Sequence, residues 1–178
     1  MQFRYLALSI LLVTGGCQTS PVNSPTIVDT PAIALQNAAK GFDQFPNIKV
    51  TIDAFDIPHV MAETANGAYF AQGFLHAYFR LWQMEFRARL AEGTSGLLTV
   101  GTLTRDDHFA QKGELLGAAL KVESEILNNP EMKAAALAYC EGVNARIRQL
   151  NVQTTPEQYQ RRGLRPRPWS PLQIAVSI

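Results

Sequence analysis

Apolar residues recur at helical spacing in the middle of the chain and predict a long helix over residues 66–92, which Gly93 and Gly96 end. At about 100° per residue the helix carries one polar row and two apolar rows. The polar row is Gln72, His76, Arg80, Gln83 and Arg87. The apolar rows are Phe70, Phe74, Ala77, Leu81, Met84 and Ala88, and Leu75, Phe79, Trp82 and Phe86. A helix that is apolar around most of its circumference is buried, so we expect more protein than a neighbouring hairpin to cover it.

Glu85 and Arg89 lie between the two apolar rows, at a spacing that predicts an ion pair. Before the helix, Ile48, Val50 and Ile52 alternate with polar residues and predict a strand with one buried face. Pro58 restricts its segment to an edge, a turn or a strand end, and an extended stretch at residues 59–62 predicts a hairpin.

Helical patterns also follow the long helix. A Gly- and Thr-containing loop leads to a helical element over residues 113–127, with Asp106 and Asp107 as a loop or a helix start. Asn129 and Pro130 predict the start of a helix that extends to about residue 150. The apolar stripe of this helix is Met132, Ala136, Tyr139, Val143, Ile147 and Leu150.

The last segment of the sequence contains few regular elements. Thr155 and Gln158 have capping-box spacing, which predicts a short helix through Arg161. "RRGLRPRPWSP" predicts an irregular crossing whose arginines are solvated or salt-bridged. The apolar ending "LQIAVSI" is expected where a structural element has been cut. The fold class is therefore mainly α with a short β hairpin near the start.

The N-terminus has the layout of a secretory signal, with Arg4 followed by an apolar run and small residues. The run is shorter than the roughly 20 residues of a membrane-spanning helix. "VTGGC" predicts a lipoprotein-type signal at residues 1–16 with lipid attachment at Cys17, and a flexible tether at residues 17–45. Gln18 after the cysteine favours a periplasmic protein anchored in the outer membrane. A plain signal peptide cut near Gly16, or an uncleaved anchor, is the alternative.

The net charge and the two cysteines do not change the predicted fold class. Sixteen Lys and Arg residues oppose fifteen Asp and Glu residues, a net charge of +1, so nothing favours nucleic-acid binding. If Cys17 is acylated, Cys140 is a buried small hydrophobic residue. Without acylation, a Cys17–Cys140 disulfide is conceivable in an oxidising compartment.

The chain lacks a recognisable catalytic set. Its histidines are His59, His76 and His108, no Gly-x-Ser-x-Gly elbow occurs, and no metal-ligand spacing is present. A single histidine beside Arg80 on a buried helix is more often a structural group than a catalytic one, and the same holds for His59 and for Trp82. We therefore identify no catalytic residue and no metal ligand in this chain.

Four segments of the chain share a pattern with a known family: "IDAFDIPHVMAET", "YFAQGFLHAYFRLWQMEFRARLAEG", "AYCEGVNARI" and "PEQYQRRGLRPRPWSP". In order and spacing they resemble the N-terminal α-chain region of the penicillin acylase (penicillin amidase) family over residues 48–171. The resemblance assigns structural roles to these motif residues: Pro58, His59, Gln72, Gly73, His76, Arg80, Trp82, Gln83, Met84, Glu85 and Trp169.

The resemblance implies an N-terminal-nucleophile hydrolase with an αββα fold, of which residues 46–178 would form a truncated α-chain region. A secreted precursor would release a β chain whose first residue, a serine, attacks amides of hydrophobic acyl groups. These are penicillin or cephalosporin side chains, or acyl-homoserine lactones. The serine's own α-amine would act as base, since its ordinary pKa is about 8. Calcium is possible in the full enzyme, whereas no ligand for it is carried over to this chain.

Three positions depart from the family pattern, which has glycine at Asp56, arginine at Gln111 and an acidic residue at Gln173. We expect the first to alter a turn, and the second to remove a buried ion pair and weaken docking to the β chain. The long helix is expected to pack against that chain. The 178-residue chain alone should then lack amidase activity and be poorly soluble. The alternatives are a non-enzymatic, lipid-anchored helical binding or scaffold protein, and an unrelated small all-α lipoprotein.

Overall fold

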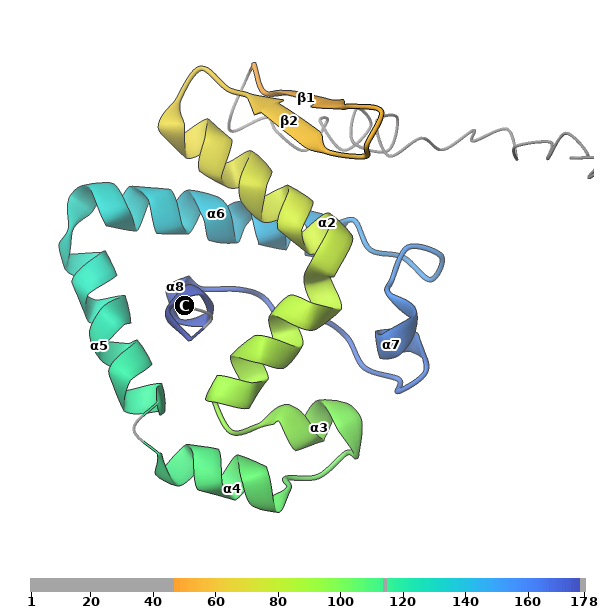
Figure 1. Cartoon of the computed structure of the whole chain (residues 1–178), viewed down its shortest axis with the longest axis vertical. Helices are drawn as coiled ribbons and strands as arrows, with labels where there is room; N and C mark the ends of the chain where they lie inside the picture. Colours follow the sequence, from red (N-terminus) through yellow and green to blue (C-terminus); the bar gives the residue numbers. More distant parts are fainter. Residues whose placement is uncertain (1–46, 114, 177–178) are drawn as a thin grey trace, which may run out of the picture.

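The computed structural model of the protein describes residues 47–113 and 115–176, and the predicted signal, Cys17 and the tether lie outside this part (Figure 1). The described part begins with an antiparallel hairpin in which Val50 pairs with Val60. Seven helices follow the hairpin within the described ranges. The elements are β1 (Lys49–Ile52), β2 (Pro58–Met61), α2 (Ala65–Ala91), α3 (Ser95–Thr99), α4 (Arg105–Lys112), α5 (Leu115–Asn128), α6 (Pro130–Arg148), α7 (Glu157–Gln160) and α8 (Pro171–Ala175).

The hairpin turn is held by one carboxylate. Asp53 Oδ1 accepts hydrogen bonds from the backbone N–H groups of Phe55 at 2.8 Å and Ile57 at 3.0 Å, which is the local bonding that Asp provides in turns. Asp56 has a φ of 60°, in the left-handed region that glycine adopts without a steric cost. Asp56 therefore keeps the glycine-like backbone that the family pattern calls for, at some conformational cost.

Helix α2 is two helical segments rather than one. Thr64 caps its N-terminus by accepting a hydrogen bond from Gly67, and Gly93, with a φ of 67°, follows its end. The helix is broken at Arg80, where φ is −139° and ψ is 21°. The single uninterrupted helix predicted from the sequence is wrong in this respect. Arg80 is neither proline nor glycine, and the break coincides with a change in packing partners (Figure 1).

The N-terminal half of α2 crosses α6 at very short range. A Cβ at Gly73 would lie 2.1 Å from Tyr139 O, and one at Gly142 would lie 2.0 Å from Phe70 O. Both are far below contact distance, so only glycine fits at either position. The two glycines let the helix backbones touch, and Phe70 and Phe74 are buried beside the crossing at 1% exposure each.

This crossing confirms that more protein than the hairpin covers α2, and that cover comes from α6 of the same chain. Packing of α2 against a β chain stays a prediction. Five members of the first apolar row are buried within the described part of this chain: Phe70, Phe74, Ala77, Leu81 and Ala88. The predicted buried face of the hairpin, Ile48, Val50 and Ile52, packs against the cluster that contains Phe70, Phe74 and Leu75. The second row fares differently, since Leu75 is buried whereas Phe79 is 41% exposed. The prediction that Phe79 belongs to the core is wrong.

The segment after α2 contains more helix than the pattern predicted. Residues 95–99 and 105–112 form α3 and α4, and Thr104 caps α4 in a capping box with Asp107. Gly96 permits α3 to approach this box, because a Cβ there would lie 2.4 Å from Asp107 Oδ2. Such five- and eight-residue helices are too short for a hydrophobic period to reveal.

Helix α6 follows the prediction closely, with Asn129 as its cap and Pro130 as its first residue. Val143 of the predicted stripe is fully buried, whereas Met132 is 48% exposed and lies outside the core. The predicted Thr155–Gln158 capping box is wrong. Pro156 is the N-cap of α7 without a side-chain bond, and Thr155 Oγ1 instead donates to Asn151 O at 2.6 Å.

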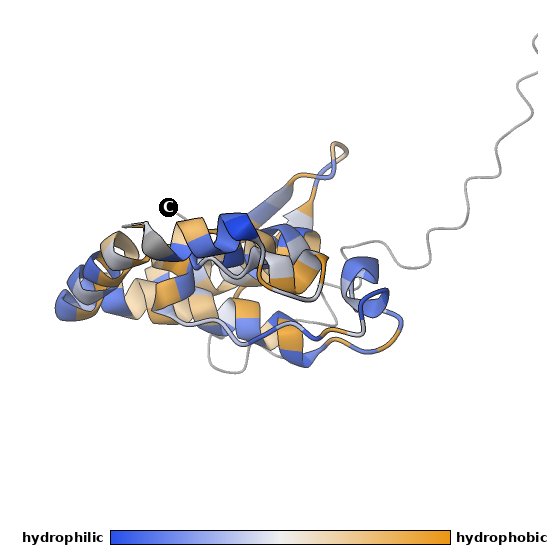
Figure 2. Cartoon of the chain, turned by 90° about the horizontal axis from the view of Figure 1, so that it is seen from below, coloured by the Kyte–Doolittle hydropathy of each residue, from blue (hydrophilic) through white to orange (hydrophobic). Residues whose placement is uncertain are grey.

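Helix α8 lies inside a frame made by α2, α4, α5 and α6 (Figure 1). Seen from below, these helices form a shallow layer with the hairpin projecting from it, and apolar and polar stretches alternate along the ribbon (Figure 2). Within the described residues, no helix is long and apolar enough to cross a membrane.

Candidate functional site

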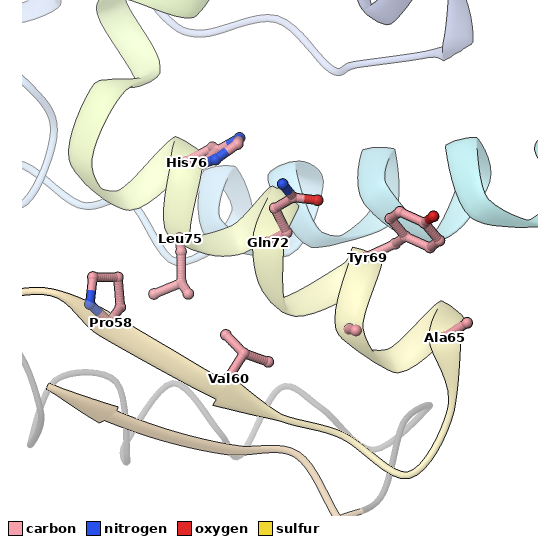
Figure 3. Close-up of a pocket in the computed structure, with 8 residues that line it drawn as sticks. Pro58, Val60, Ala65, Tyr69, Gln72, Leu75 and His76 are labelled. Atoms are coloured by element: carbon pink, nitrogen blue, oxygen red, sulfur yellow. The ribbon is translucent and has the colours of Figure 1, made fainter.

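The polar row of α2 is exposed along its length, and two of its members border a cavity. Gln72 and His76 line a cavity of about 540 Å³ between α2 and β2. Figure 3 shows Val60 and Leu75 facing each other across the gap, with Gln72 and His76 on the side of the helix turned away from the strand. The residues lining the cavity are Pro58, Val60, Ala65, Ala68, Tyr69, Gln72, Leu75 and His76.

A second cavity of about 290 Å³ adjoins the first, and Tyr69 and Gln72 line both. Its other lining residues come from α5, α6 and α8: Ile126, Met132, Ala135, Ala136, Tyr139 and Ile174. We call the two adjoining cavities the α2 groove. The groove is mainly apolar, and Tyr69, Gln72, His76 and Tyr139 are the lining residues with polar side-chain groups.

His76 is paired with a tyrosine of α6. Its Nδ1 lies 2.9 Å from Tyr139 Oη, and the two rings meet edge to face at 5.8 Å. Burial lowers the pKa of His76, which favours the neutral imidazole, and raises the pKa of Tyr139 to about 12. Both groups are therefore neutral at pH 7. The pair hydrogen-bonds across the α2–α6 crossing and carries no charge into the groove.

The C-terminal half of α2 carries a buried carboxylate. Glu85 is fully buried, and its Oε1 accepts a 2.8 Å hydrogen bond from Arg89 Nε, which confirms the predicted ion pair. Tyr159 donates to Glu85 Oε2 at 3.3 Å. Arg167 Nε lies 3.3 Å from Glu85 Oε1, an ion pair without hydrogen-bond geometry. Two cations from different segments thus converge on one buried anion.

A second carboxylate completes this group. Glu92, just after α2, accepts two hydrogen bonds from Arg167, at 2.7 and 2.8 Å, which is the paired geometry that Arg favours with carboxylates. We call Glu85, Arg89, Glu92 and Arg167 the charge cluster. Its two anions and two cations balance, and it joins the irregular crossing to the end of α2.

Gln173 contacts the charge cluster from α8. Its Oε1 accepts hydrogen bonds from the N–H and hydroxyl of Ser170, and its Nε2 lies 3.4 Å from Glu92 Oε1. An acidic residue here, as in the family pattern, would bring a third carboxylate next to Glu92. The Gln173 amide instead donates a hydrogen bond to Glu92, whereas a carboxylate at this position would repel the Glu92 carboxylate.

Trp82 and Trp169 lie in a core cluster with Leu81, Val143 and Tyr159, in which Trp169 is buried and Trp82 is partly buried. Trp82 packs edge-on against the Tyr159 ring at 4.9 Å, with the Arg162 guanidinium 5.3 Å from its own ring centre. Trp169 is 5% exposed, and its backbone exchanges two hydrogen bonds with the Asn144 side chain. Met84 packs on this cluster, whereas Gln83 and Arg80 are exposed. The motif tryptophans therefore lie in packing positions.

Three other predicted residues lie away from the groove's polar groups. His59 bonds Asp53 through Nε2 at 2.9 Å and its side chain is 59% exposed. Gln111 donates to Gly93 O at 2.9 Å, so an amide-to-carbonyl bond stands where the family pattern has an arginine. Cys140 is buried as predicted, and burial raises the pKa of its thiol to about 12, which makes it unreactive at neutral pH.

The described residues contain no group of three or more His, Cys, Asp or Glu side chains that could hold a metal ion.

Sequence reasoning placed Tyr139 in an apolar stripe and did not single out Gly142, Asn144, Tyr159 or Arg167. All five belong to segments that carry the resemblance: Tyr139, Gly142 and Asn144 to "AYCEGVNARI", and Tyr159 and Arg167 to "PEQYQRRGLRPRPWSP". Those motifs were a usable signal that these residues matter. They could not name the partners of Arg167, which lie 75 and 82 residues away in sequence.

The described part of the chain has the fold of part of a known enzyme. The chain superposes on the solved thermostable penicillin G acylase from Alcaligenes faecalis with a TM-score of 0.64 and 20% identity, covering 74% of this chain and 69% of that one. The described part is thus a mainly helical fragment with an antiparallel hairpin that shares the fold of part of that enzyme.

The family model described as penicillin amidase matches residues 47–178, and this chain belongs to that family. Penicillin G acylase of Escherichia coli is 26% identical over 149 residues, and penicillin acylase 2 proenzyme of Pseudomonas sp. (strain SE83) is 32% identical over 126 residues. These matches cover 82% and 70% of this chain and 16% of each relative. The chain therefore spans about a sixth of the curated relatives' length.

Proposed function

We propose that this chain is the N-terminal α-chain region of an amidohydrolase that cleaves amides of hydrophobic acyl groups, with the reacting serine on another segment. The family match over residues 47–178 carries this proposal. Both curated relatives are named penicillin acylases, which favours penicillin side chains as substrates ahead of cephalosporin side chains or acyl-homoserine lactones.

The residues present support a structural contribution to such an enzyme. His76 is neutral and is held by a tyrosine, and no serine or cysteine of the described residues bonds its imidazole, so it does not form a nucleophile–base pair there. Glu85 is neutralised by Arg89 and Arg167. These groups position α2, α6 and the irregular crossing, and the chain acts as a framework for a site formed elsewhere.

Reconstitution tests this proposal. The chain is produced together with the part of the Pseudomonas sp. proenzyme that it does not cover, and hydrolysis of a chromogenic phenylacetyl amide is measured. We expect turnover only when both parts are present. Complete inactivity of the co-purified pair would contradict the amidohydrolase proposal and favour a binding or scaffold role.

We also propose that Cys17 is lipidated and anchors the protein to a membrane on the periplasmic side. The signal-like order of residues 1–17 supports this. Metabolic labelling with a palmitate analogue should mark the wild-type chain and not Cys17→Ala. Equal labelling of both would contradict lipidation at this cysteine.

A further inference from the structure

The β hairpin has one covered face and one exposed face. Val50 and Val60 pack against the core cluster under α2, and Val60 faces Leu75 (Figure 3). Side chains alternate between the two faces along a strand. On the opposite face, Ile57 beside the start of β2 is 52% exposed and Met61 at its end is 67% exposed. A two-stranded hairpin is only marginally stable by itself, so packing on this second face would stabilise it.

The sequence just before the hairpin has the pattern of an amphipathic helix. Thr30 and Pro31 are typical of a helix start, and Pro46 of a helix end. At about 100° per residue, one arc of roughly 120° holds every apolar residue of positions 35–45. These residues, which we call the N-terminal stripe, are Leu35, Ala38, Ala39, Phe42 and Phe45. The opposite arc holds Gln36, Asn37, Lys40, Gly41, Asp43 and Gln44. The pattern predicts that residues 31–45 need an apolar surface to cover the stripe.

The end of this segment lies close to the exposed face of the hairpin. Asn47, the first described residue, has a φ of 68°, a left-handed conformation that Asn adopts in turns. Lys49 then begins β1 and pairs directly with Met61. The lengths also agree, because the N-terminal stripe would rise about 15 Å as a helix and the row from Ile57 to Met61 spans about 13 Å. The segment is therefore long enough to cover both exposed side chains.

We propose that residues 31–45 of this chain dock on the exposed face of the β hairpin, with the N-terminal stripe against Ile57 and Met61. The hairpin is then packed on both faces, by α2 on one side and by the segment on the other. The predicted tether shortens from residues 17–45 to residues 17–30. Lipid at Cys17 would therefore hold the described part of the chain closer to the membrane than a tether of the full length.

Oxidation of methionine by hydrogen peroxide tests whether Met61 is covered. Within the described residues Met61 is more exposed than Met132, at 67% against 48%, so an uncovered hairpin would oxidise faster at Met61. With the segment docked, we expect Met61 in the purified 178-residue chain to oxidise at least about threefold more slowly than Met132. Peptide mass spectrometry measures the sulfoxide at each position. Oxidation of Met61 at the rate of Met132, or faster, would overturn the proposal.

Two substitutions in the segment test the contact through its stripe. Phe42→Asp places a charge in the N-terminal stripe, whereas Gln44→Asp, the matched control, places the same charge in the opposite arc. Phe42→Asp should speed oxidation of Met61 by at least about threefold and leave Met132 unchanged, and Gln44→Asp should keep both wild-type rates. Equal Met61 rates in the two variants would contradict docking through the stripe. An equal rise at Met61 and Met132 would also contradict it, because general loosening of the fold would then be the cause.

Photo-crosslinking identifies what covers Met61. A benzoylphenylalanine at position 61 of the full chain should crosslink to residues 31–45 of the same molecule. The control position is Val152, which is 83% exposed in the turn after α6 and should give no crosslink to that segment. Mixing isotopically light and heavy chains distinguishes the same molecule from a second copy. Crosslinks from position 61 to a second copy, to another part of the same chain, or to nothing would each overturn the proposal.

Discussion

The two halves of α2 are held in different ways, although one continuous polar row runs along both. The half from Ala65 to Phe79 packs through shape, with Gly73 and Gly142 bringing two helix backbones into contact. The half after the break at Arg80 packs through charge, with Glu85 fully buried between two arginines. An added Cβ at either glycine should therefore destabilise the first half, and loss of the Glu85 charge should destabilise the second half.

The difference shows what each part of the helix contributes. Close backbone approach fixes the distance between α2 and α6, and the α2 groove lies beside that crossing. The charge cluster fixes the irregular crossing, which local hydrogen bonding alone would not hold. The first half is therefore fixed by backbone contact with α6, and the second half is fixed by ion pairs to the irregular crossing.

The largest effect is expected at the helix crossing. Gly142→Ala places a Cβ 2.0 Å from Phe70 O and should cost at least about 3 kcal/mol of unfolding free energy, because the backbones must separate. Gly117→Ala is the matched control, since nothing lies within 4 Å of its added Cβ on α5. It should instead stabilise the chain by about 0.5–1 kcal/mol. Urea unfolding measures the free energy of unfolding of both variants. Similar values for the two would contradict the claim that backbone contact at Gly142 stabilises the α2–α6 crossing.

A somewhat smaller loss is expected in the charge-held half. Glu85→Gln removes the buried anion that pairs with Arg89, while Arg167 keeps Glu92 as its partner, and the loss of the buried pair should cost about 3 kcal/mol. Glu157→Gln is the control, because Glu157 forms an exposed pair with Arg161 and should change stability by less than about 0.5 kcal/mol. If thermal unfolding gave equal, small shifts for both, the charge cluster would not hold this half.

Acid should weaken the region after α2. Hydrogen bonds from Thr104, together with those from Ser95 and Gly96, lower the pKa of Asp107 from its ordinary 3.8 despite its burial. A lowered folded pKa means that this stabilisation is complete above pH 3.8 and is lost as the pH falls below it. The wild-type free energy of unfolding should therefore drop between about pH 5 and pH 2.

Asp107→Asn separates this group from the other carboxylates. The variant should start less stable near pH 5 and show a shallower drop toward pH 2, whereas Asp106→Asn, at an exposed position one residue earlier, should keep the wild-type slope. Denaturant unfolding across this range gives the slopes. Parallel curves for wild type and Asp107→Asn would contradict the assignment.

The smallest effect concerns the hairpin that covers the shape-held half. Asp56 has a φ of 60°, so Asp56→Gly should stabilise the chain by about 0.5 kcal/mol. Ala54→Gly, in the same turn without a positive φ, should destabilise it slightly. A thermal shift in the same direction for both would show that backbone conformation at position 56 is not limiting.

The sequence predicted the elements that have a long hydrophobic period. The hairpin, the extent of α2, the start of α6 and the Glu85–Arg89 pair all follow from local spacing, and each is present. Local spacing did not reveal the break at Arg80, since no proline or glycine marks it. It also missed α3 and α4, which are shorter than the window in which a period can be recognised.

The candidate site was harder to predict than the fold. His76 and Gln72 were found through the family motif, yet the partner of His76 lies 63 residues away and its pairing depends on the Gly73–Gly142 crossing. Arg167 was seen only as one of several arginines in an irregular segment. Contacts of such separation are set by tertiary packing, which propensity and spacing do not encode.

The central claim is that this chain frames a reaction site and does not contain the reacting group. The direct measurement is hydrolysis of a chromogenic phenylacetyl amide by the purified 178-residue chain without any second chain. The account predicts release of the chromophore at the rate of buffer alone. Hydrolysis above that rate, co-eluting with the chain and removed by His76→Leu, would contradict it.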